Sequence, residues 1–429
     1  MFRMRLILPV LLLGMLVPTS LFAQDAIDKA DTAWMLISSA LVLLMVPGLA
    51  LFYGGMVRSK NVLSSIMHSL IAMGLITMQW VIVGYSLAFG GDHWGVIGGL
   101  EHVLLNGVGM EPIGTIPALV FMIFQGMFAI ITPALISGAV AERMKFSTYC
   151  VFILAWATLV YDPIAHWVWA SGGWLFAMGA LDFAGGTVVH LNSGISALVL
   201  ALVIGARMGY KVQPMRPNNL VFTMLGAGLL WFGWFGFNAG SALSSGALAA
   251  QAFVTTHIAA SAAAVAWTAA EWWFSRRPSM LGTASGLVAG LVVITPAAGF
   301  VSPAGAMLMG VIGGVVCYLA VLAKHPLGYD DSLDAFGIHG VGGMLGALLT
   351  GVFATTMFNP QGTPGLLEGN LAVMVPQILG VVSTLVYAGV MTWIIVKVLE
   401  KTMGLRVTED QEREGLDINQ HGEQGYFLT

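Results

Sequence analysis

Residues 182–194 read DFAGGTVVHLNSG, an aspartate followed at a short distance by a glycine-flanked histidine within an apolar run. A second stretch of the same kind, DAFGIHGVGG, spans residues 334–343. His190 and His339 lie 149 residues apart, in the fifth and tenth apolar segments of the chain. This duplication predicts two halves of five segments each. Because five is odd, the second half would be inverted relative to the first, with a shared site near the membrane midplane.

The bulk composition supports a membrane location for this duplication. Of the 429 residues, 58% are hydrophobic and 9% are charged. Soluble domains carry roughly 25% charged residues, so most of this surface faces lipid. We predict an all-α integral membrane protein of eleven transmembrane helices: two inverted five-helix halves plus a final helix. Apolar runs long enough to cross the ~30 Å hydrocarbon core occur at 33–57, 63–89, 115–140, 147–168, 186–206, 219–240, 249–274, 280–297, 304–323, 336–358 and 371–398.

Basic residues fall in alternate loops between these segments. The loops near 90–114, 169–185, 241–248, 298–303 and 359–370 contain no Lys or Arg, and Lys29 is the one basic residue of the mature chain on their side. Because basic loops stay in the cytoplasm, we expect the N-terminus outside and the C-terminus inside. The cytoplasmic set is Arg58, Lys60, Arg143, Lys145, Arg207, Lys211, Arg216, Arg276, Arg277, Lys324, Lys397, Lys401, Arg406 and Arg413.

The two ends of the chain differ from the region between them. Residues 1–23 have the pattern of a secretory signal, basic at the start, apolar in the middle and small at Ala23,. Cleavage after Ala23 is one interpretation, and a retained extra helix is the other. Residues 24–399 form the predicted transmembrane domain. Residues 400–429 hold about a quarter of all charged residues and predict a cytoplasmic tail, either a solvated end or a docking and coupling element.

The two histidines are the most informative ionisable residues within the segments. Ionisable groups in a membrane are costly and therefore functional candidates, and imidazole can be neutral at physiological pH. Two neutral imidazoles can share one proton, one as donor and one as acceptor, and so line a dry pore without carrying charge. The alternatives are two unrelated core histidines or a metal site, for which no HExxH pattern or further ligands are present. Cys150 and Cys317 predict buried thiols rather than a disulfide.

Aromatic residues gather on the predicted outer side. Phe124 and Phe128 share one helix face at spacing i, i+4. Any single ring is equally well explained as part of an interfacial aromatic belt. A cage of rings with one hydroxyl, however, holds a small cation without a carboxylate, at up to ~2 kcal/mol per contact. A cation that can shed a proton, such as ammonium, could then continue as a neutral molecule. The other residues of these clusters are His166, Trp167, Trp169, Trp231, Trp234, Phe235, Phe237 and Ser241.

At this level of detail the chain resembles the ammonium transporter family (Amt/Mep/Rh), in its bacterial Amt branch. The resemblance covers about residues 28–425, and the motifs are specific only in combination. The matching segments are PGLALFYGGMVRSKNVLS, FQGMFA, AERMKF, DPIAHWVW, LDFAGGTVVH, GWFGFNAGSA, ITPAAGF, DAFGIHGVGG and QEREGLD.

The resemblance implies a role for each matching residue. Phe128, Trp169 and Ser241 would form the outer ammonium-recruitment site, with Phe124 at its border. Phe128 and Phe237 would form a stacked gate. Asp182 would be the buried acid that orients backbone groups and assists deprotonation. His190 and His339 would line the pore and relay protons. Trp234 and Thr295 would be further pore residues. Met127, Ala170 and a loop to Asp182 that is one residue longer depart from the family pattern, which affects the expected shape of the outer site.

The resemblance also implies an assembly and a location. We expect a homotrimer with one pore per subunit in the bacterial cytoplasmic membrane, in contact with lipid and capped inside by a PII-type signalling protein. The substrate would be ammonium, crossing as ammonia, with methylammonium as a possible analogue. No cofactor, metal or nucleic acid is expected. The alternative is an ammonium sensor that signals through its tail. A membrane enzyme is disfavoured because the sequence offers no nucleophile or metal set.

Overall fold

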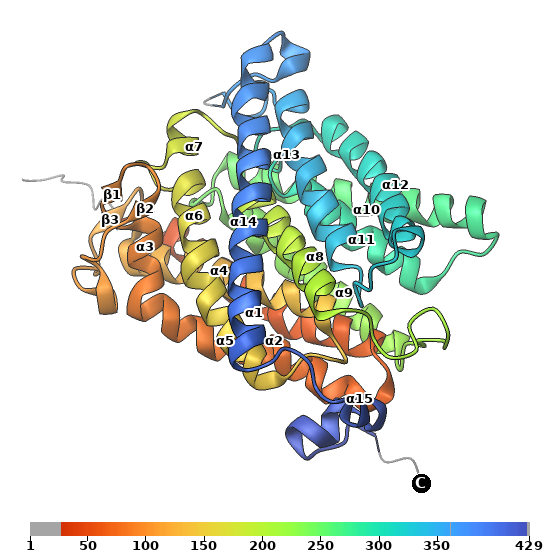
Figure 1. The fold of residues 1–429 in the computed structure, drawn as a ribbon. Coiled ribbons are helices and arrows are strands. Elements are labelled where there is room, and N and C mark those ends of the chain that lie inside the picture. The colour runs from red at the N-terminus through yellow and green to blue at the C-terminus, as the bar shows by residue number, and fades with distance from the viewer. Residues whose placement is uncertain (1–26, 361, 427–429) are drawn as a thin grey trace, which may run out of the picture.

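The computed structural model describes residues 27–360 and 362–426. The predicted signal segment, residues 1–23, lies outside these residues. The described chain is a bundle of long helices with two small hairpins, β1–β2 and β3–β4, at one end (Figure 1). The hairpins are β1 (Asp92–His93) with β2 (Ile97–Gly98) and β3 (Pro112–Ile113) with β4 (Ile116–Pro117).

Most of the bundle consists of α-helices, and some predicted apolar runs are divided into two α-helices or an α-helix and a π-turn. They are α1 (Lys29–Met56), α2 (Val62–Gln79), α3 (Tyr85–Phe89), α4 (Ala118–Val140), α5 (Phe146–Trp156), α6 (Asp162–Trp169), α7 (Trp174–Ala177), α8 (Asn192–Ile204), α9 (Leu220–Gly240), α10 (Ala247–Ser275), α11 (Met280–Ile294), α12 (Pro303–Leu327), α13 (Val341–Phe353), α14 (Met374–Thr402) and α15 (Glu409–Glu414). Short 3₁₀ turns are η1 (Ser59–Asn61), η3 (Val103–Leu105), η7 (Leu366–Glu368) and η8 (Leu371–Val373).

Five wider π-helical turns are present among the described residues, four within or at the start of membrane helices and one in the tail. They are η2 (Trp80–Gly84), η4 (Ala157–Tyr161), η5 (Gly186–Leu191), η6 (Phe336–Gly340) and η9 (Asp417–His421). Turns of this kind are rare and frequently occur at functional sites. Two of them, η5 and η6, contain His190 and His339.

The described residues contain ten helical stretches long and apolar enough to cross a membrane, together with the shorter apolar helix α11. The predicted helical membrane architecture is confirmed at this level. The predicted segment 280–297 contains α11, which has 15 residues and is about 22 Å long. Pro296 follows it and cannot donate a backbone hydrogen bond to continue the helix. The count of eleven spans and the inversion of the two halves stay predictions.

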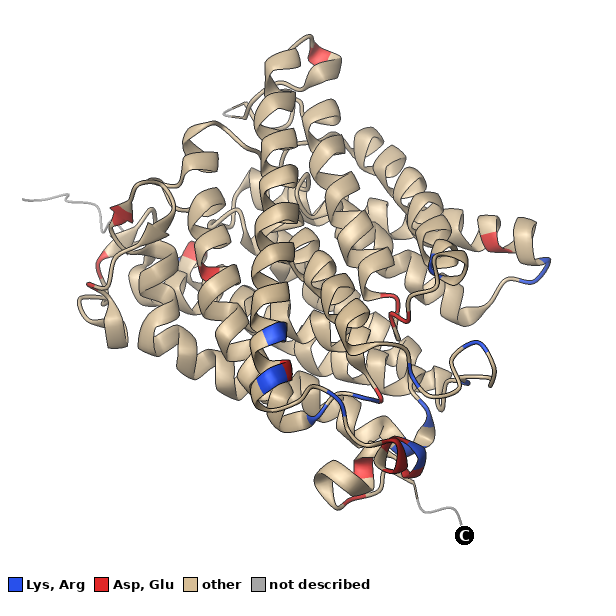
Figure 2. Ribbon diagram, in the orientation of Figure 1, with Lys and Arg blue, Asp and Glu red and all other residues tan. Residues whose placement is uncertain are grey.

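The tail is folded against the loops at one end of the bundle, where Figure 2 shows most Lys and Arg residues. The N–H of Lys145 donates to the carbonyl of Leu405 at 2.9 Å, and the N–H of Val407 donates to the carbonyl of Arg143 at 3.1 Å. Asp417 accepts hydrogen bonds from the N–H groups of Leu63 and Ser64 at the start of α2. Of the two interpretations of the tail, residues 400–426 therefore do not fit a free solvated end.

Buried ion pairs join the loops beneath the tail. Glu142 pairs with both Arg58 and Arg207 at 3.0 Å, and Arg207 also pairs with Asp330 at 2.8 Å. Burial raises the pKa of Glu142, but Arg207 and Arg58 outweigh this effect and hold the pKa below its usual value,. Because these loops follow different helices, the network fixes the ends of α1, α4, α8 and α12 relative to one another.

Candidate functional site

An open cavity of about 270 Å³ lies at the hairpin end of the bundle, and its floor is aromatic. Phe128 and Trp169 meet edge to face there, with ring centroids 5.7 Å apart and planes at 87°. Phe124 packs on the other side of Phe128 at 5.0 Å. We call this cavity the vestibule. Its lining is Phe121, Gln125, Phe128, Val168, Trp169, Phe176, Ala180, Asp182, Phe183, Ser241, Leu243 and Phe300.

Hydrogen bonds to the backbone orient the polar groups of the vestibule. The indole N–H of Trp169 donates to the carbonyl oxygen of Asp182 at 2.9 Å. The Ser241 hydroxyl donates to the carbonyl oxygen of Phe237 at 2.8 Å. Because its proton is used in this way, the Ser241 oxygen is left to accept a hydrogen bond from a bound cation.

Asp182 closes the N-terminus of the turn that carries His190. Its carboxylate accepts from the N–H groups of Gly185, Gly186, Thr187 and Val188 at 2.6–3.2 Å, and also from the Thr187 hydroxyl. A carboxylate at a helix N-terminus satisfies the free N–H groups and opposes the positive end of the helix dipole. Gly185 has a φ of +108°, and this left-handed conformation lets the chain turn back over the carboxylate.

Below the vestibule the path is closed by two phenylalanines. The rings of Phe128 and Phe237 lie 4.2 Å apart, with an angle of 33° between their planes. Both side chains are buried, with at most 1% of their surface exposed. A hydrated cation cannot pass between rings at this separation, so this pair forms a closed gate.

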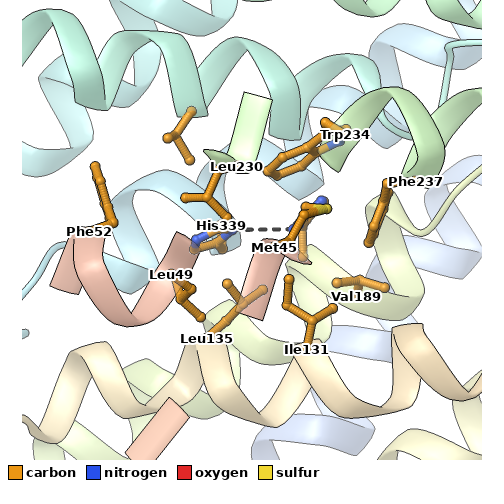
Figure 3. Close-up of a pocket in the computed structure, with 12 residues that line it drawn as sticks. Met45, Leu49, Phe52, Ile131, Leu135, Val189, Leu230, Trp234, Phe237 and His339 are labelled. Carbon is orange, nitrogen blue, oxygen red and sulfur yellow. Dashed lines mark hydrogen bonds between the residues drawn. The ribbon is translucent and has the colours of Figure 1, made fainter. Parts of the chain in front are cut away.

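Beyond the gate lies a small enclosed cavity that holds the two histidines (Figure 3). Nδ1 of His339 lies 3.2 Å from Nδ1 of His190, and the ring centroids are 5.3 Å apart. The cavity volume is about 10 Å³, at the lower limit for one water-sized molecule. Apart from the histidines its lining is Met45, Leu49, Phe52, Ile131, Leu135, Val189, Leu230, Trp234, Phe237 and Val288.

The geometry requires the two histidines to play different roles. When both rings are neutral, only one Nδ1 can carry the shared proton, so the other ring is protonated at Nε2. Nε2 of His190 has no hydrogen-bond partner among the described residues. His190 is also stacked against Trp234 at 5.3 Å, and the Trp234 indole N–H donates to the Thr295 hydroxyl at 2.9 Å. One histidine of the pair therefore donates the shared hydrogen bond and the other accepts it, and the surrounding wall is apolar.

Close backbone contact brings the two histidine-bearing turns together. A Cβ on Gly343 would lie 2.6 Å from the carbonyl oxygen of Gly186 and 2.9 Å from the Cβ of His190. A Cβ on Gly194 would lie closer still, 2.1 Å from the backbone nitrogen of Gly340. Any side chain at these positions would push the turns apart, which explains the glycine-rich flanks of both histidines.

The predicted site residues lie around two cavities on either side of the Phe128–Phe237 pair. Phe128, Trp169, Asp182 and Ser241 line the vestibule, while Phe237, His190, His339 and Trp234 line the inner cavity. Phe124 packs behind Phe128, and Thr295 lies behind Trp234. Sequence reasoning missed the apolar wall from α1, although Met45, Leu49 and Phe52 fall on one helix face at spacing i, i+4, i+7.

One pairing inferred from the sequence differs in the structure. Asp334 was expected to precede His339 in the way that Asp182 precedes His190. Asp334 instead pairs with Lys324, and Asp331 accepts from the N–H of Phe336 at 2.8 Å, at the start of η6. Asp331 lies eight residues before His339, as Asp182 lies eight before His190. The equal spacing was the signal that could have identified it.

The arrangement limits the chemistry that the site can perform. In the described part of the chain, no group of three His, Cys, Asp or Glu side chains could hold a metal ion. The vestibule can hold a small cation through ring faces and one hydroxyl. The inner cavity offers neutral walls and one imidazole pair, which suits a small uncharged molecule.

This fold and site define a multi-pass helical membrane protein with an aromatic outer cavity and a small inner cavity lined by two histidines. The chain belongs to the Ammonium Transporter Family, whose model matches residues 33–426. It is 50% identical to the ammonium transporter of Bacillus subtilis (strain 168), over 93% of this chain and 99% of that protein. It is 51% identical to the ammonium transporter of Aquifex aeolicus (strain VF5), over 95% of this chain and 96% of that protein.

Solved structures resemble this fold over about nine-tenths of the chain. The crystal structure of Saccharomyces cerevisiae Mep2 matches with a TM-score of 0.85 at 37% identity, covering 90% of this chain and 89% of that one. The structure of a sensor Amt protein matches with a TM-score of 0.85 at 28% identity, covering 91% and 98%.

Proposed function

We propose that this protein takes up ammonium across the cytoplasmic membrane and is a transporter rather than an enzyme. The observation that carries the proposal is the His190–His339 pair, held at 3.2 Å in an apolar cavity behind a closed aromatic gate. Ammonium binds in the vestibule between Phe128, Trp169 and Ser241. It gives up one proton to the histidine pair beyond the gate, and ammonia passes Phe237 into the histidine cavity. His190 accepts this proton at its Nε2, which is unpartnered in the described part of the chain. The Nδ1 proton of His190 passes to Nδ1 of His339, and His339 releases its own Nε2 proton,.

Asp182 supports these transport steps by holding other groups of the site in position. Its oxygens already accept five hydrogen bonds, so it is not the free acceptor of the released proton. It holds Trp169 through its backbone carbonyl and the His190 turn through its carboxylate. Asp182 therefore assists deprotonation indirectly, because it fixes the positions of the groups that surround the cation next to the gate.

The orientation and assembly are part of the proposal. The clustering of Lys and Arg at the tail end supports a cytoplasmic C-terminus and an outward vestibule,. The acids eight residues before each histidine support inverted halves. By likeness to its family, the protein is proposed to be a homotrimer in a bacterial inner membrane, with a PII-type protein at its cytoplasmic face.

A second candidate is an ammonium sensor of the same architecture. The observation in its favour is the tail, which is folded onto loops that follow several helices. The likeness to a sensor Amt protein gives this alternative a structural precedent. In this case the output would be the state of the tail rather than ammonium flux.

Current recorded from liposomes on a supported membrane tests the proposal. Purified protein should give a saturable current on addition of ammonium, absent with potassium and lost when His190 and His339 are both replaced by Leu. No current, but an ammonia-dependent change in internal pH, would mean neutral gas conduction. Neither signal would favour the sensor.

A further inference from the structure

A buried glutamine on α14 holds the loop that contains Asp182. Gln377 lies in the first turn of α14 and has 3% of its surface exposed. Its Oε1 accepts from the N–H of Leu181 at 2.6 Å, and its Nε2 donates to the carbonyl of Leu181 at 3.0 Å. Nε2 also donates to the carbonyl of Ala347 on α13 at 2.7 Å. One side chain therefore pairs both backbone groups of Leu181 and one of α13.

These partners fix the orientation of the amide. Only the amide oxygen can accept from an N–H group, and only the nitrogen can donate to two carbonyls. Leu181 and Ala347 are both buried. The adjoining cavity is about 10 Å³, room for at most one water. Loss of the amide would leave the buried N–H and carbonyl of Leu181 unpaired, each with a desolvation penalty,. It would also remove the link to the Ala347 carbonyl, which lies within α13.

The residue held by Gln377 immediately precedes Asp182. The carbonyl of Asp182 receives the Trp169 indole, and its carboxylate caps the turn of His190. A shift of Leu181 would therefore move both the ring that faces the vestibule and the start of the histidine turn. The third bond ties this loop to α13, which follows His339.

Gln377 itself lines neither the vestibule nor the histidine cavity. Its neighbours on α14, Val375, Ile378 and Leu379, are 39–55% exposed on the outside of the bundle. Any effect of Gln377 on transport must therefore act through the backbone that it holds.

We propose that Gln377 is a positioning residue for cation recruitment and sets the affinity of the vestibule by holding Leu181 and Asp182 in place; this rests on the proposed transport function. The polar group comes from α14, a helix that lines neither the vestibule nor the histidine cavity. Recruitment then depends on a helix that does not touch the substrate.

Two substitutions separate positioning from simple loss of stability. Gln377→Leu keeps the approximate volume but removes all three bonds. Gln377→Glu restores them only in part and depends on pH: a neutral carboxyl can accept from Leu181 N–H and donate to its carbonyl, whereas a carboxylate repels both carbonyl oxygens. The matched control is Gln79→Leu. Gln79 is also buried in an apolar helix, but its bonds go to Thr158 and Asp162 rather than to vestibule residues.

The measurement is the ammonium current in liposomes as a function of ammonium concentration and pH. We expect Gln377→Leu to raise the half-saturating concentration about tenfold, with the maximal current per protein within about twofold of wild type. Gln79→Leu should leave half-saturation within about twofold of wild type. In Gln377→Glu the half-saturating concentration, relative to wild type, should rise with pH as the carboxyl ionises.

Unchanged half-saturation in folded Gln377→Leu would overturn the proposal. If that variant does not fold, Gln377→Glu decides, because a pH-independent ratio to wild type would also overturn it. A missing wild-type current would overturn the proposed function, and this inference with it. A wild-type current with unaltered Gln377 variants would overturn the inference alone.

Discussion

At the scale of single residues, the proposed mechanism gives recruitment and conduction to different side chains. Trp169 contributes a ring face to the vestibule, whereas His190 lies beyond the closed Phe128–Phe237 pair. Substitutions at the two positions should therefore affect different kinetic parameters.

Trp169→Leu should raise the half-saturating ammonium concentration by about tenfold or more, because a desolvated cation–π contact is worth up to ~2 kcal/mol. His190→Ala should instead change the maximal current or the selectivity against potassium. Current–concentration curves measure both effects, with Trp94→Leu as control because Trp94 is 93% exposed and lines neither cavity. Wild-type curves for both site variants would contradict the assignment.

Asp331 allows a prediction about pH and stability. Burial raises the pKa of its carboxyl to about 6, with Lys324 lowering it and Asp334 raising it. This pKa lies above the ordinary value of 3.8. The contribution of the neutral Asp331 carboxyl to the stability of the folded protein is therefore complete below about pH 4, and it is lost as the pH rises through about 6. Asp331→Asn keeps an acceptor for Phe336 N–H without the charge.

The Asp331→Asn variant should therefore unfold at a higher temperature than wild type at pH 8. The free-energy difference should be on the order of 3 kcal/mol, and it should vanish near pH 4. Thermal unfolding in detergent across this pH range measures the effect. A variant that is less stable than wild type at pH 8 would show that the carboxylate is needed in its charged form.

At the scale of elements, the site depends on two π-helical turns that cross closely. The π-turns η5 and η6 widen the helices at His190 and His339 and direct both rings into one cavity. The crossing depends on glycine, since a Cβ on Gly343 would meet backbone of the opposite turn at 2.6 Å.

Gly343→Ala should therefore destabilise the protein by about 1–3 kcal/mol through overpacking and reduce the ammonium current by separating the two rings. Gly228→Ala is the matched control, because no described atom lies within 4 Å of a Cβ at that position. Replacing this glycine within α9 should be neutral or stabilising by up to about 1 kcal/mol. Melting temperature and current together distinguish the two variants.

At the scale of the whole molecule, the tail joins loops that are far apart in the sequence. Glu412, with 1% of its surface exposed, pairs with Arg406 and accepts from the N–H of Met208 at 2.6 Å. The N–H of Leu416 donates to the Asn61 side chain at 2.8 Å. A buried acid in the tail thus holds it against the loop that follows α8.

Glu412→Ala should release this segment from the bundle. Loss of hydrogen bonds to a charged group costs about 2 kcal/mol, so amide exchange of residues 405–426 should become roughly thirtyfold faster by local opening. Hydrogen exchange read by mass spectrometry gives the result. Glu414→Ala is the control, because Glu414 is exposed and its side chain bonds to Asn419 within the tail. Equal exchange in both variants would mean that other contacts hold the tail.

The sequence by itself determined the membrane class and the positions of the apolar segments, because hydrophobicity is a local property. Side-chain chemistry and the family resemblance indicated candidate site residues, but not the apolar wall from α1. Only the tertiary structure decided how the site is positioned. Gln377 meets Leu181 across 196 residues, Asp331 rather than Asp334 caps the second histidine turn, and the tail packs on distant loops. Helix packing decides which buried backbone groups still need a hydrogen-bond partner and which side chains are near enough to supply one. A local sequence pattern does not contain this information.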